Sequence, residues 1–313
     1  MTNIDSPDQL QAYEQASIAT TTTTPYFLYG ELIKSKQTFL LVYTTFFAYL
    51  ISAWSTGFDL NVFLWLNVGV FFAISGSTLL NMYIDRDIDA LMERTRDRPL
   101  PMGKISPGTV LRHGLLFTFT GLLAIAIFVD YLTLTVVFLG AFFDVVVYSL
   151  LLKRRTRYSI IFGGIAGGLP ALAGSTAASA SITSAGLLMG LFVLCWIPLH
   201  ILTLALLPKN LEGYQKAQIP MWPVIRSKTQ TIQVITLSAI LSTVLIALTG
   251  IVLNIRLLPL LPLFAFCIYM IWLSVLNLRK PTQVRTFRIF KLASMLMAFA
   301  FFWLLLGVIV SPY

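Results

Sequence analysis

The sequence predicts an all-α, polytopic membrane protein with nine transmembrane helices, and three observations lead to that fold class. Of the 313 residues, 57% are hydrophobic and only 11% are charged, whereas about a quarter of the residues of a soluble domain are charged. Apolar runs of about 20 residues, the length that crosses a bilayer, recur along the chain. Lys and Arg gather in every second loop between these runs, which is typical of alternating membrane crossings.

The apolar runs follow a polar tail. Residues 1–30, which include five consecutive threonines, are expected to form a weakly ordered tail, and residues 31–313 a single domain. The expected spans are 37–56, 61–84, 110–129, 132–152, 159–178, 184–207, 229–253, 257–278 and 287–310. Hydropathy alone identifies the fifth, glycine-rich run less clearly than the others. The last three runs contain no acidic residue, so we assign them to packing and lipid contact.

The basic residues predict the orientation of the chain. Two Lys precede the first span, and the loops after the second, fourth, sixth and eighth spans, counted with the first five residues of the span that follows, carry six, four, four and five Lys or Arg. Only Arg256 lies on the other side. Because basic loops face the cytoplasm, we expect a multi-pass protein of the cell membrane with a cytoplasmic N-terminus and an outside C-terminus. The net charge of +9 then calls for no nucleic-acid partner.

A polar stretch between the second and third spans, residues 81–108, carries the main candidate site. Asn81, Asp85 and Asp89 stand four residues apart, so on a helix they share one face. Oxygen-rich side chains of this kind suit Mg²⁺, which commonly bridges to the phosphates of a substrate. A solvated, charged loop between two membrane helices is the alternative interpretation.

Basic residues follow these oxygen ligands within a short distance along the chain. Arg94, Arg98 and Lys104 lie in the same loop, and guanidinium groups match the geometry of phosphate. Together with the oxygen ligands, they predict a Mg²⁺-diphosphate site at the membrane surface, with the three oxygen-bearing residues also acting in catalysis.

The pattern NxxxDxxxD followed by RTRDRPLP resembles the first signature of the UbiA family of intramembrane prenyltransferases. The longer string DRDIDALMERTRDRPLPMGKISP, residues 85–107, resembles the branch of that family that farnesylates heme. The resemblance runs from about Leu32 to the end of the chain. It implies nine helices around a central cavity, Mg²⁺ as cofactor, and farnesyl diphosphate and heme B as substrates. The implied product is heme O, which carries a hydroxyethylfarnesyl group in place of one vinyl group.

A second motif closes the fourth span. Asp144 and Tyr148 are four residues apart, and Lys153 and Arg154 follow. Snorkelling and membrane anchoring would explain the basic pair on their own. The string YSLLLKRRT resembles one found at this place in the same branch, which makes Lys153 and Arg154 candidate diphosphate contacts and Tyr148 a candidate catalytic residue. Asp144 is a further candidate, because an acid inside a membrane span is costly and usually functional.

The glycine-rich run that comes next is expected to thin the wall of a cavity. Small residues let helices approach closely, and Pro170 is expected to open a local break in its helix.

The sixth span and the loop after it hold the remaining candidates. His200, in the string WIPLHI, is either a packing residue, a ligand of heme iron or a group that handles a proton, and the sequence does not choose among these. Lys209 is a candidate diphosphate contact and Glu212 a weak metal ligand, because Asn210 and Glu212 replace the aspartates of the family's second motif. Lys34 is another diphosphate candidate, although the family's following proline is Ser35 here.

Other functions stay open at this point. A related prenyltransferase with an aromatic-acid or glycerol-phosphate acceptor would use the same aspartate motif. A non-enzymatic transporter or heme-binding membrane protein is the less favoured alternative, because the acids gather near one membrane face rather than at the midplane. For the favoured function, the expected partners are the two substrates, the lipid bilayer, and heme A synthase or oxidase assembly factors.

Overall fold

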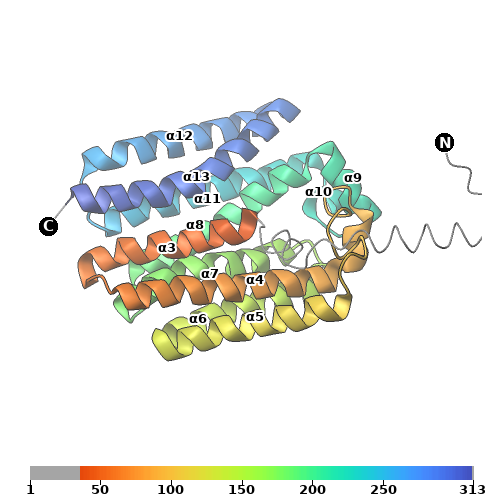
Figure 1. Cartoon of the computed structure of the whole chain (residues 1–313). Helices are drawn as coiled ribbons and strands as arrows, with labels where there is room; N and C mark the ends of the chain where they lie inside the picture. Colours follow the sequence, from red (N-terminus) through yellow and green to blue (C-terminus); the bar gives the residue numbers. More distant parts are fainter. Residues whose placement is uncertain (1–35, 312–313) are drawn as a thin grey trace, which may run out of the picture.

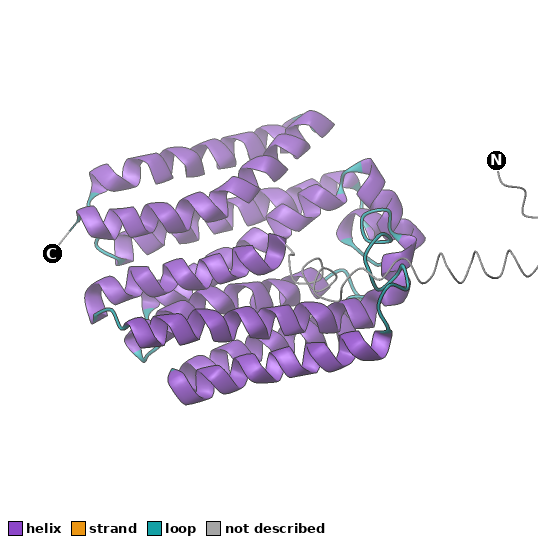
Figure 2. Cartoon of the chain, viewed as in Figure 1, coloured by secondary structure: helices purple, strands orange, loops and turns teal. Residues whose placement is uncertain are grey.

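The computed structural model describes residues 36–311, which form helices joined by short turns, with no strand in that range (Figures 1 and 2). The tail at 1–30 and the candidate Lys34 lie outside the described residues. The elements are α3 (Lys36–Thr56), α4 (Leu60–Leu91), α5 (Pro107–Phe128), α6 (Tyr131–Phe142), η1 (Phe143–Leu152), α7 (Ser159–Ser179), α8 (Ser184–Ala205), α9 (Pro208–Lys216), α10 (Trp222–Ile225), α11 (Lys228–Val252), α12 (Leu257–Arg279) and α13 (Gln283–Val310).

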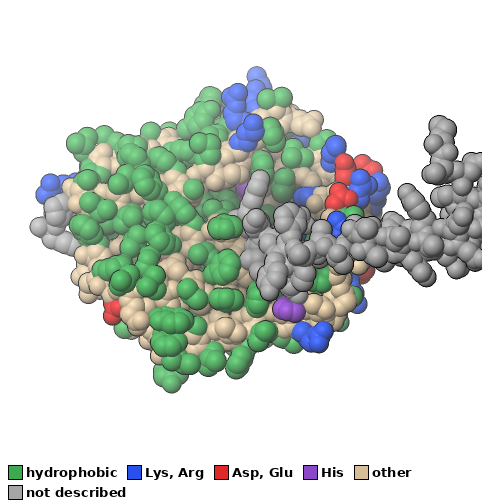
Figure 3. All heavy atoms as spheres, in the orientation of Figure 1, with side chains coloured by type: hydrophobic (Ala, Val, Ile, Leu, Met, Phe, Trp, Pro, Cys, Tyr) green, Lys and Arg blue, Asp and Glu red, His purple; other side chains and the backbone are tan. Residues whose placement is uncertain are grey.

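Within residues 36–311, nine helical segments are long and apolar enough to cross a membrane, with α6 and η1 forming one of them. This confirms the predicted fold class. The long helices lie side by side, and α9 and α10 sit at one end of the bundle together with the segment that joins α4 to α5 (Figure 1). Hydrophobic side chains cover the middle of the visible face, and most charged groups lie toward its ends (Figure 3).

Polar side chains at the turns decide where several helices begin. The Asp59 carboxylate accepts hydrogen bonds from the backbone N–H groups of Asn61 and Val62, at 2.8 and 3.1 Å. Ser227 and Gln230 form a reciprocal capping box at the start of α11. Such caps satisfy N–H groups that have no partner inside the helix. They fix the helix ends that the hydropathy pattern predicts only approximately.

Helix α4 continues beyond the predicted end of the second span. The apolar run ends near residue 84, but the helix extends to Leu91. Its last two turns are amphipathic, with Asp85, Ile88 and Asp89 buried and Arg86 and Asp87 exposed. A helix is stabilised when one of its faces is buried, and it does not require a continuous apolar run. The aspartate motif therefore lies on the membrane helix itself.

Glycines bring α4 and α5 into direct backbone contact. A Cβ built at Gly121 would lie 2.4 Å from the Gly69 carbonyl oxygen and 2.5 Å from the Ala73 nitrogen. A Cβ at Gly76 would lie 2.4 Å from the Thr118 nitrogen. In a membrane, where lipid is as apolar as a side chain, such close approach is a main source of helix association.

Replacing Gly121 by Ala is expected to destabilise the protein by about 2 kcal/mol, because overpacking of a tight contact forces the helices apart. The matched control is Gly108→Ala on the same helix, where an added Cβ meets nothing within 4 Å. Thermal unfolding of both variants in detergent measures the effect. Equal melting temperatures for Gly121→Ala and Gly108→Ala would contradict the role of this contact.

The glycine-rich helix α7 also packs closely on its neighbour, but it is not broken. A Cβ at Gly168 would lie 2.3 Å from the Gly190 carbonyl oxygen of α8, which agrees with the expected close approach. Pro170 lies inside the continuous helix Ser159–Ser179, so the expected break is wrong. The Pro170 carbonyl accepts a hydrogen bond from Thr45 Oγ1 at 2.9 Å, which joins α7 to α3, and membrane helices tolerate proline in their interior.

The fourth span ends in a π-helix that the sequence did not predict. Residues 143–152 form η1, and the backbone N–H of Lys153 donates to the Tyr148 carbonyl five residues back, at 2.7 Å. π-turns are rare and often occur at functional sites. This wide turn determines where the side chains of Asp144, Tyr148 and Lys153 lie.

Candidate active site

Asp85 and Lys153 form a buried ion pair between α4 and the end of η1. Lys153 Nζ donates to Asp85 Oδ2, and the two side chains are only 18% and 7% exposed. Charges removed from water need a partner of opposite sign. The structure therefore brings together two residues from different sequence motifs, 68 positions apart.

Asn81 lies one turn before Asp85 and is oriented by Asp144. Asn81 Nδ2 donates to Asp144 Oδ2 at 2.8 Å. Because an ionised carboxylate can only accept hydrogen bonds, this contact turns the amide oxygen of Asn81 away from Asp144. Asp144 is thus placed beside the metal-ligand candidates, in contact with one of them.

Two oxygen atoms in this cluster are buried and have no hydrogen-bond partner among the described residues. They are Asn81 Oδ1 and Asp85 Oδ1, four positions apart on one face of α4. Buried polar atoms are normally satisfied, so such an exception calls for an explanation such as a missing ion. Uncharged and anionic oxygen atoms are the ligands that Mg²⁺ takes. The residues present therefore fit a hard cation at this point.

Asp89 is the third oxygen-bearing residue on this face of α4, and the loop that follows α4 covers it. Arg98 Nη1 donates to Asp89 Oδ2 at 2.7 Å, and Thr95 Oγ1 donates to the Asp89 carbonyl at 2.9 Å. Thr95 is 1% exposed, and its role in folding this loop back was not predicted. Nothing in the sequence distinguishes this threonine, because the charged residues of the same loop are the stronger candidates for a functional role. Arg94 and Lys104 of the same loop are exposed.

Arg154 points away from this cluster, toward an exposed carboxylate. Its guanidinium contacts both carboxylate oxygens of Asp87, at 2.6 and 2.5 Å, and the Ile84 carbonyl at 2.8 Å. Hydrogen bonding to Asp87 raises the pKa of the Arg154 guanidinium. Arg154 thus fastens the loop after η1 to α4, and its predicted contact with diphosphate stays a prediction.

Tyr148 lies beside the Lys153 ammonium. Lys153 Nζ is 5.7 Å from the centre of the Tyr148 ring, within reach of a cation–π interaction. A Cβ at Gly163 of α7 would lie 3.2 Å from the same ring, so a glycine there leaves room for the tyrosine.

His200 occupies an aromatic stack on α8. Its ring lies 4.6 Å from Trp196 and 4.9 Å from Phe290 of α13, with interplanar angles of 12° and 25°. His200 Nδ1 is 3.4 Å from Ser294 Oγ. No hydrogen bond between described residues involves His200 Nε2. The aromatic stack supports a packing role for His200. Its Nε2 atom, which has no partner among the described residues, is compatible with a chemical role as well.

The candidates of the second motif lie on the short helix α9, near the surface. Lys209 Nζ contacts Glu93 Oε1 at 3.2 Å, so α9 meets the loop after α4. Glu212 pairs with Lys216 at 2.7 Å, and this hydrogen bond holds the pKa of the Glu212 carboxyl below its usual range. Asn210 Nδ2 donates to the Leu204 carbonyl at 3.0 Å. A metal site at Glu212 stays a prediction, as does the central cavity.

Comparisons with known proteins place this geometry in context. The model of the UbiA prenyltransferase family matches residues 41–309. The protoheme IX farnesyltransferase of Archaeoglobus fulgidus is 37% identical over 279 residues, covering 89% of this chain and 96% of that protein. The protein of the same name from Korarchaeum cryptofilum is 37% identical over 271 residues, covering 84% and 87%.

Solved structures share the fold at lower identity. A digeranylgeranylglyceryl phosphate synthase superposes with a TM-score of 0.76 at 21% identity, covering 91% of this chain and 99% of that one. A UbiA homolog from Archaeoglobus fulgidus bound to GPP and Mg²⁺ gives a TM-score of 0.61 at 14% identity, covering 88% and 99%. These likenesses show the arrangement of the helices.

Proposed function

The chain belongs to the UbiA prenyltransferase family and is a multi-pass membrane protein, and on that premise we propose that it farnesylates heme B. In this reaction a vinyl carbon of heme B bonds to the farnesyl carbon of farnesyl diphosphate, and diphosphate leaves. One water adds its hydroxyl to the carbon beside the heme ring and releases a proton, which gives heme O. The observation that carries the proposal is the similarity to protoheme IX farnesyltransferases over nearly the whole chain.

We propose that Asn81, Asp85 and Asp89 hold Mg²⁺ with the diphosphate of the substrate. The support is the pair of buried, partner-free oxygen atoms on Asn81 and Asp85. When bound, the cation would neutralise the negative charge that develops on the leaving diphosphate. This is the part of the reaction that needs most help, because an allylic carbon releases diphosphate only when that charge is balanced.

We propose that the basic side chains of the site have different partners before and after substrate binds. Without substrate, Lys153 and Arg98 balance the buried carboxylates of Asp85 and Asp89. With a metal diphosphate bound, the cation would balance those carboxylates, and Lys153 and Arg98 would donate their N–H groups to the phosphate oxygens. Lys153 and Arg98 are therefore the diphosphate contacts that the geometry supports best. Arg94 and Lys104, exposed in the same loop, would attract the anion from the membrane surface.

The surroundings of the site also protect the reaction. A farnesyl cation is trapped by any water that reaches it, so the site must exclude bulk water until the heme vinyl group has attacked. Membrane-spanning helices supply such an environment and accept the farnesyl chain. For His200 we propose a place on the acceptor side, where Nε2 would meet the heme iron or a proton of the reacting group.

We also propose that the site faces the cytoplasm of a cell whose plasma membrane holds the protein. The Lys- and Arg-rich loops support this orientation. They lie at the same end of the bundle as Asp85, and the N-terminus would be cytoplasmic and the C-terminus outside.

The test of the proposed function is a heme analysis. The chain is expressed in cells that lack heme O, membranes are supplied with heme B, farnesyl diphosphate and Mg²⁺, and the extracted hemes are weighed by mass spectrometry. The expected product is heme B plus one farnesyl group and one water. Unmodified heme from a folded protein would contradict the proposal, and a screen of aromatic-acid and glycerol-phosphate acceptors with diphosphate release as readout would follow.

Replacing Asp144 by Leu is expected to raise the Mg²⁺ concentration needed for half-maximal activity by at least about tenfold. A partner that orients a metal ligand typically contributes 10- to 100-fold to metal affinity, and Leu cannot accept the Asn81 hydrogen bond. Asp144→Asn is the matched control, because its amide oxygen still accepts that bond. An unchanged Mg²⁺ requirement in a folded Asp144→Leu variant would show that Asp144 does not position Asn81.

A further inference from the structure

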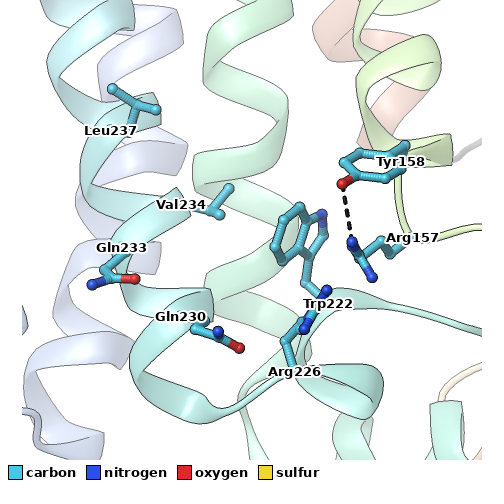
Figure 4. Close-up of a pocket in the computed structure, with 8 residues that line it drawn as sticks. All are labelled: Arg157, Tyr158, Trp222, Arg226, Gln230, Gln233, Val234 and Leu237. Atoms are coloured by element: carbon cyan, nitrogen blue, oxygen red, sulfur yellow. Dashed lines mark hydrogen bonds between the residues drawn. The ribbon is translucent and has the colours of Figure 1, made fainter.

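A cavity of about 430 Å³ opens beside the N-terminal part of α11 (Figure 4), and neither Asp85 nor Lys153 lines it. Its polar part comes from Arg157, Tyr158, Trp222 and Arg226, from the turn before α7 and the region of α10. The remaining lining residues lie on one face of α11: Gln230, Gln233, Val234 and Leu237. None of the residues that line the cavity is acidic.

The polar end of the cavity holds positive charge that no carboxylate balances. None of the ion pairs between described residues includes Arg157 or Arg226. The Arg157 guanidinium lies 4.7 Å from the Tyr158 ring and 5.1 Å from the Trp222 ring, and it donates to the Tyr158 hydroxyl at 2.9 Å. These rings fix the guanidinium in place, and stacked guanidinium groups keep their N–H edges available for an anion.

Two N–H groups at this point are buried and have no hydrogen-bond partner among the described residues. They are Arg157 Nε and Trp222 Nε1. Buried donors without partners are rare in proteins, and both belong to residues that line the cavity. Unpaired donors beside unbalanced positive charge are suited to an acceptor that carries negative charge, such as a phosphate oxygen.

The cavity becomes apolar along the direction of the membrane span. Gln230 lies beside Arg226, whereas Val234 and Leu237 follow further along α11, the helix Lys228–Val252 (Figure 4). Leu237 is 57% exposed, on a face that lipid would cover. Trp222 stands at the boundary, where indole rings favour the membrane interface. A ligand that fits must be anionic at one end and apolar at the other.

We propose that this cavity binds an anionic membrane phospholipid, with its headgroup phosphate between Arg157 and Arg226 and an acyl chain along Val234 and Leu237. Anionic lipids are enriched in the leaflet that basic loops face, and the cavity lies at the Lys- and Arg-rich end of the bundle. With no acidic residue to hold a divalent cation, the site differs in kind from the diphosphate site. It is independent of the proposed reaction.

The test compares lipid binding by the full-length protein in detergent, measured by native mass spectrometry with phosphatidylglycerol and phosphatidylcholine. The Arg157→Gln/Arg226→Gln variant is expected to bind phosphatidylglycerol roughly tenfold more weakly than the wild type, since each cation near an anionic lipid adds a fewfold gain. Binding of phosphatidylcholine should not change. Arg279→Gln/Arg288→Gln, which removes the same charge from exposed positions on α12 and α13, is the matched control and should retain wild-type binding.

Three outcomes would overturn the proposal. These are unchanged phosphatidylglycerol binding in Arg157→Gln/Arg226→Gln, an equal loss in the Arg279→Gln/Arg288→Gln control, and displacement of the lipid by millimolar inorganic phosphate, which would indicate a small-anion site. Lipids with brominated acyl chains provide a second readout, because bromine near Trp222 quenches its fluorescence, and the Arg157- and Arg226-dependent part of the quenching should be lost in Trp222→Phe. If the double variant fails to fold, Arg226→Gln alone, at an exposed position, tests the same contact.

Discussion

Replacing Asp85 by Asn is expected to lower turnover on the order of a thousandfold, the scale of losing one preorganised electrostatic contact to the transition state. The substitution keeps the shape of the side chain and removes its charge. It therefore weakens the binding of Mg²⁺ and leaves the buried Lys153 ammonium without its carboxylate. Initial rates of diphosphate release over a range of Mg²⁺ concentrations should show both a lower maximum and a higher Mg²⁺ requirement.

The control for this substitution lies two residues further along the same helix. Asp87 is exposed and pairs with Arg154 on the surface, and exposed ion pairs contribute at most about 1 kcal/mol. Asp87→Asn should thus keep turnover within roughly threefold of the wild type. Wild-type activity in a folded Asp85→Asn variant would remove the basis for a metal site on α4.

Replacing Lys153 by Gln is expected to reduce turnover on the order of a hundredfold without raising the Mg²⁺ requirement. The reason is that Lys153 pairs with the Asp85 carboxylate in the substrate-free structure and, in the proposed reaction, would contact the diphosphate afterwards. Its loss frees Asp85 for the metal but removes a positive charge from the leaving group. In this variant turnover should therefore fall while the Mg²⁺ requirement does not rise. In Asp85→Asn, by contrast, turnover should fall and the Mg²⁺ requirement should rise together.

Arg155→Gln is the matched control for Lys153→Gln, because it removes an exposed positive charge from the same loop. It should leave both quantities near their wild-type values. A Lys153→Gln variant that needs much more Mg²⁺ would mean that the lysine supports the metal ligands structurally rather than contacting the diphosphate.

Part of this architecture could be predicted because it depends on local periodicity. Nine apolar runs separated by basic loops predict nine spans, and the spacing of Asn81 and Asp85 predicts that they share a helix face. Both features depend on residues within a few turns of one another. The extension of α4 to Leu91 followed the same rule, although hydropathy alone ended the span too early.

Contacts between segments that lie far apart in the sequence could not be predicted from local periodicity. The pairing of Lys153 with Asp85, and of Arg154 with Asp87 rather than with the site, depends on how η1 packs against α4. Two adjacent basic residues are alike in sequence, and only the helix geometry separates their roles. Pro170 shows the reverse case, since a residue that usually breaks helices lies inside the continuous helix α7.

The π-helical turn before Lys153 makes the length of this segment as important as its composition. Each residue of an α-helix turns the chain by about 100°, and a π-turn holds one residue more than an α-turn. Removing a single residue from 143–152 would rotate the chain that follows by about 100° and turn Lys153 away from Asp85, even if every charged side chain were kept. Natural variation in this segment should accordingly tolerate exchanges of one apolar residue for another far better than deletions.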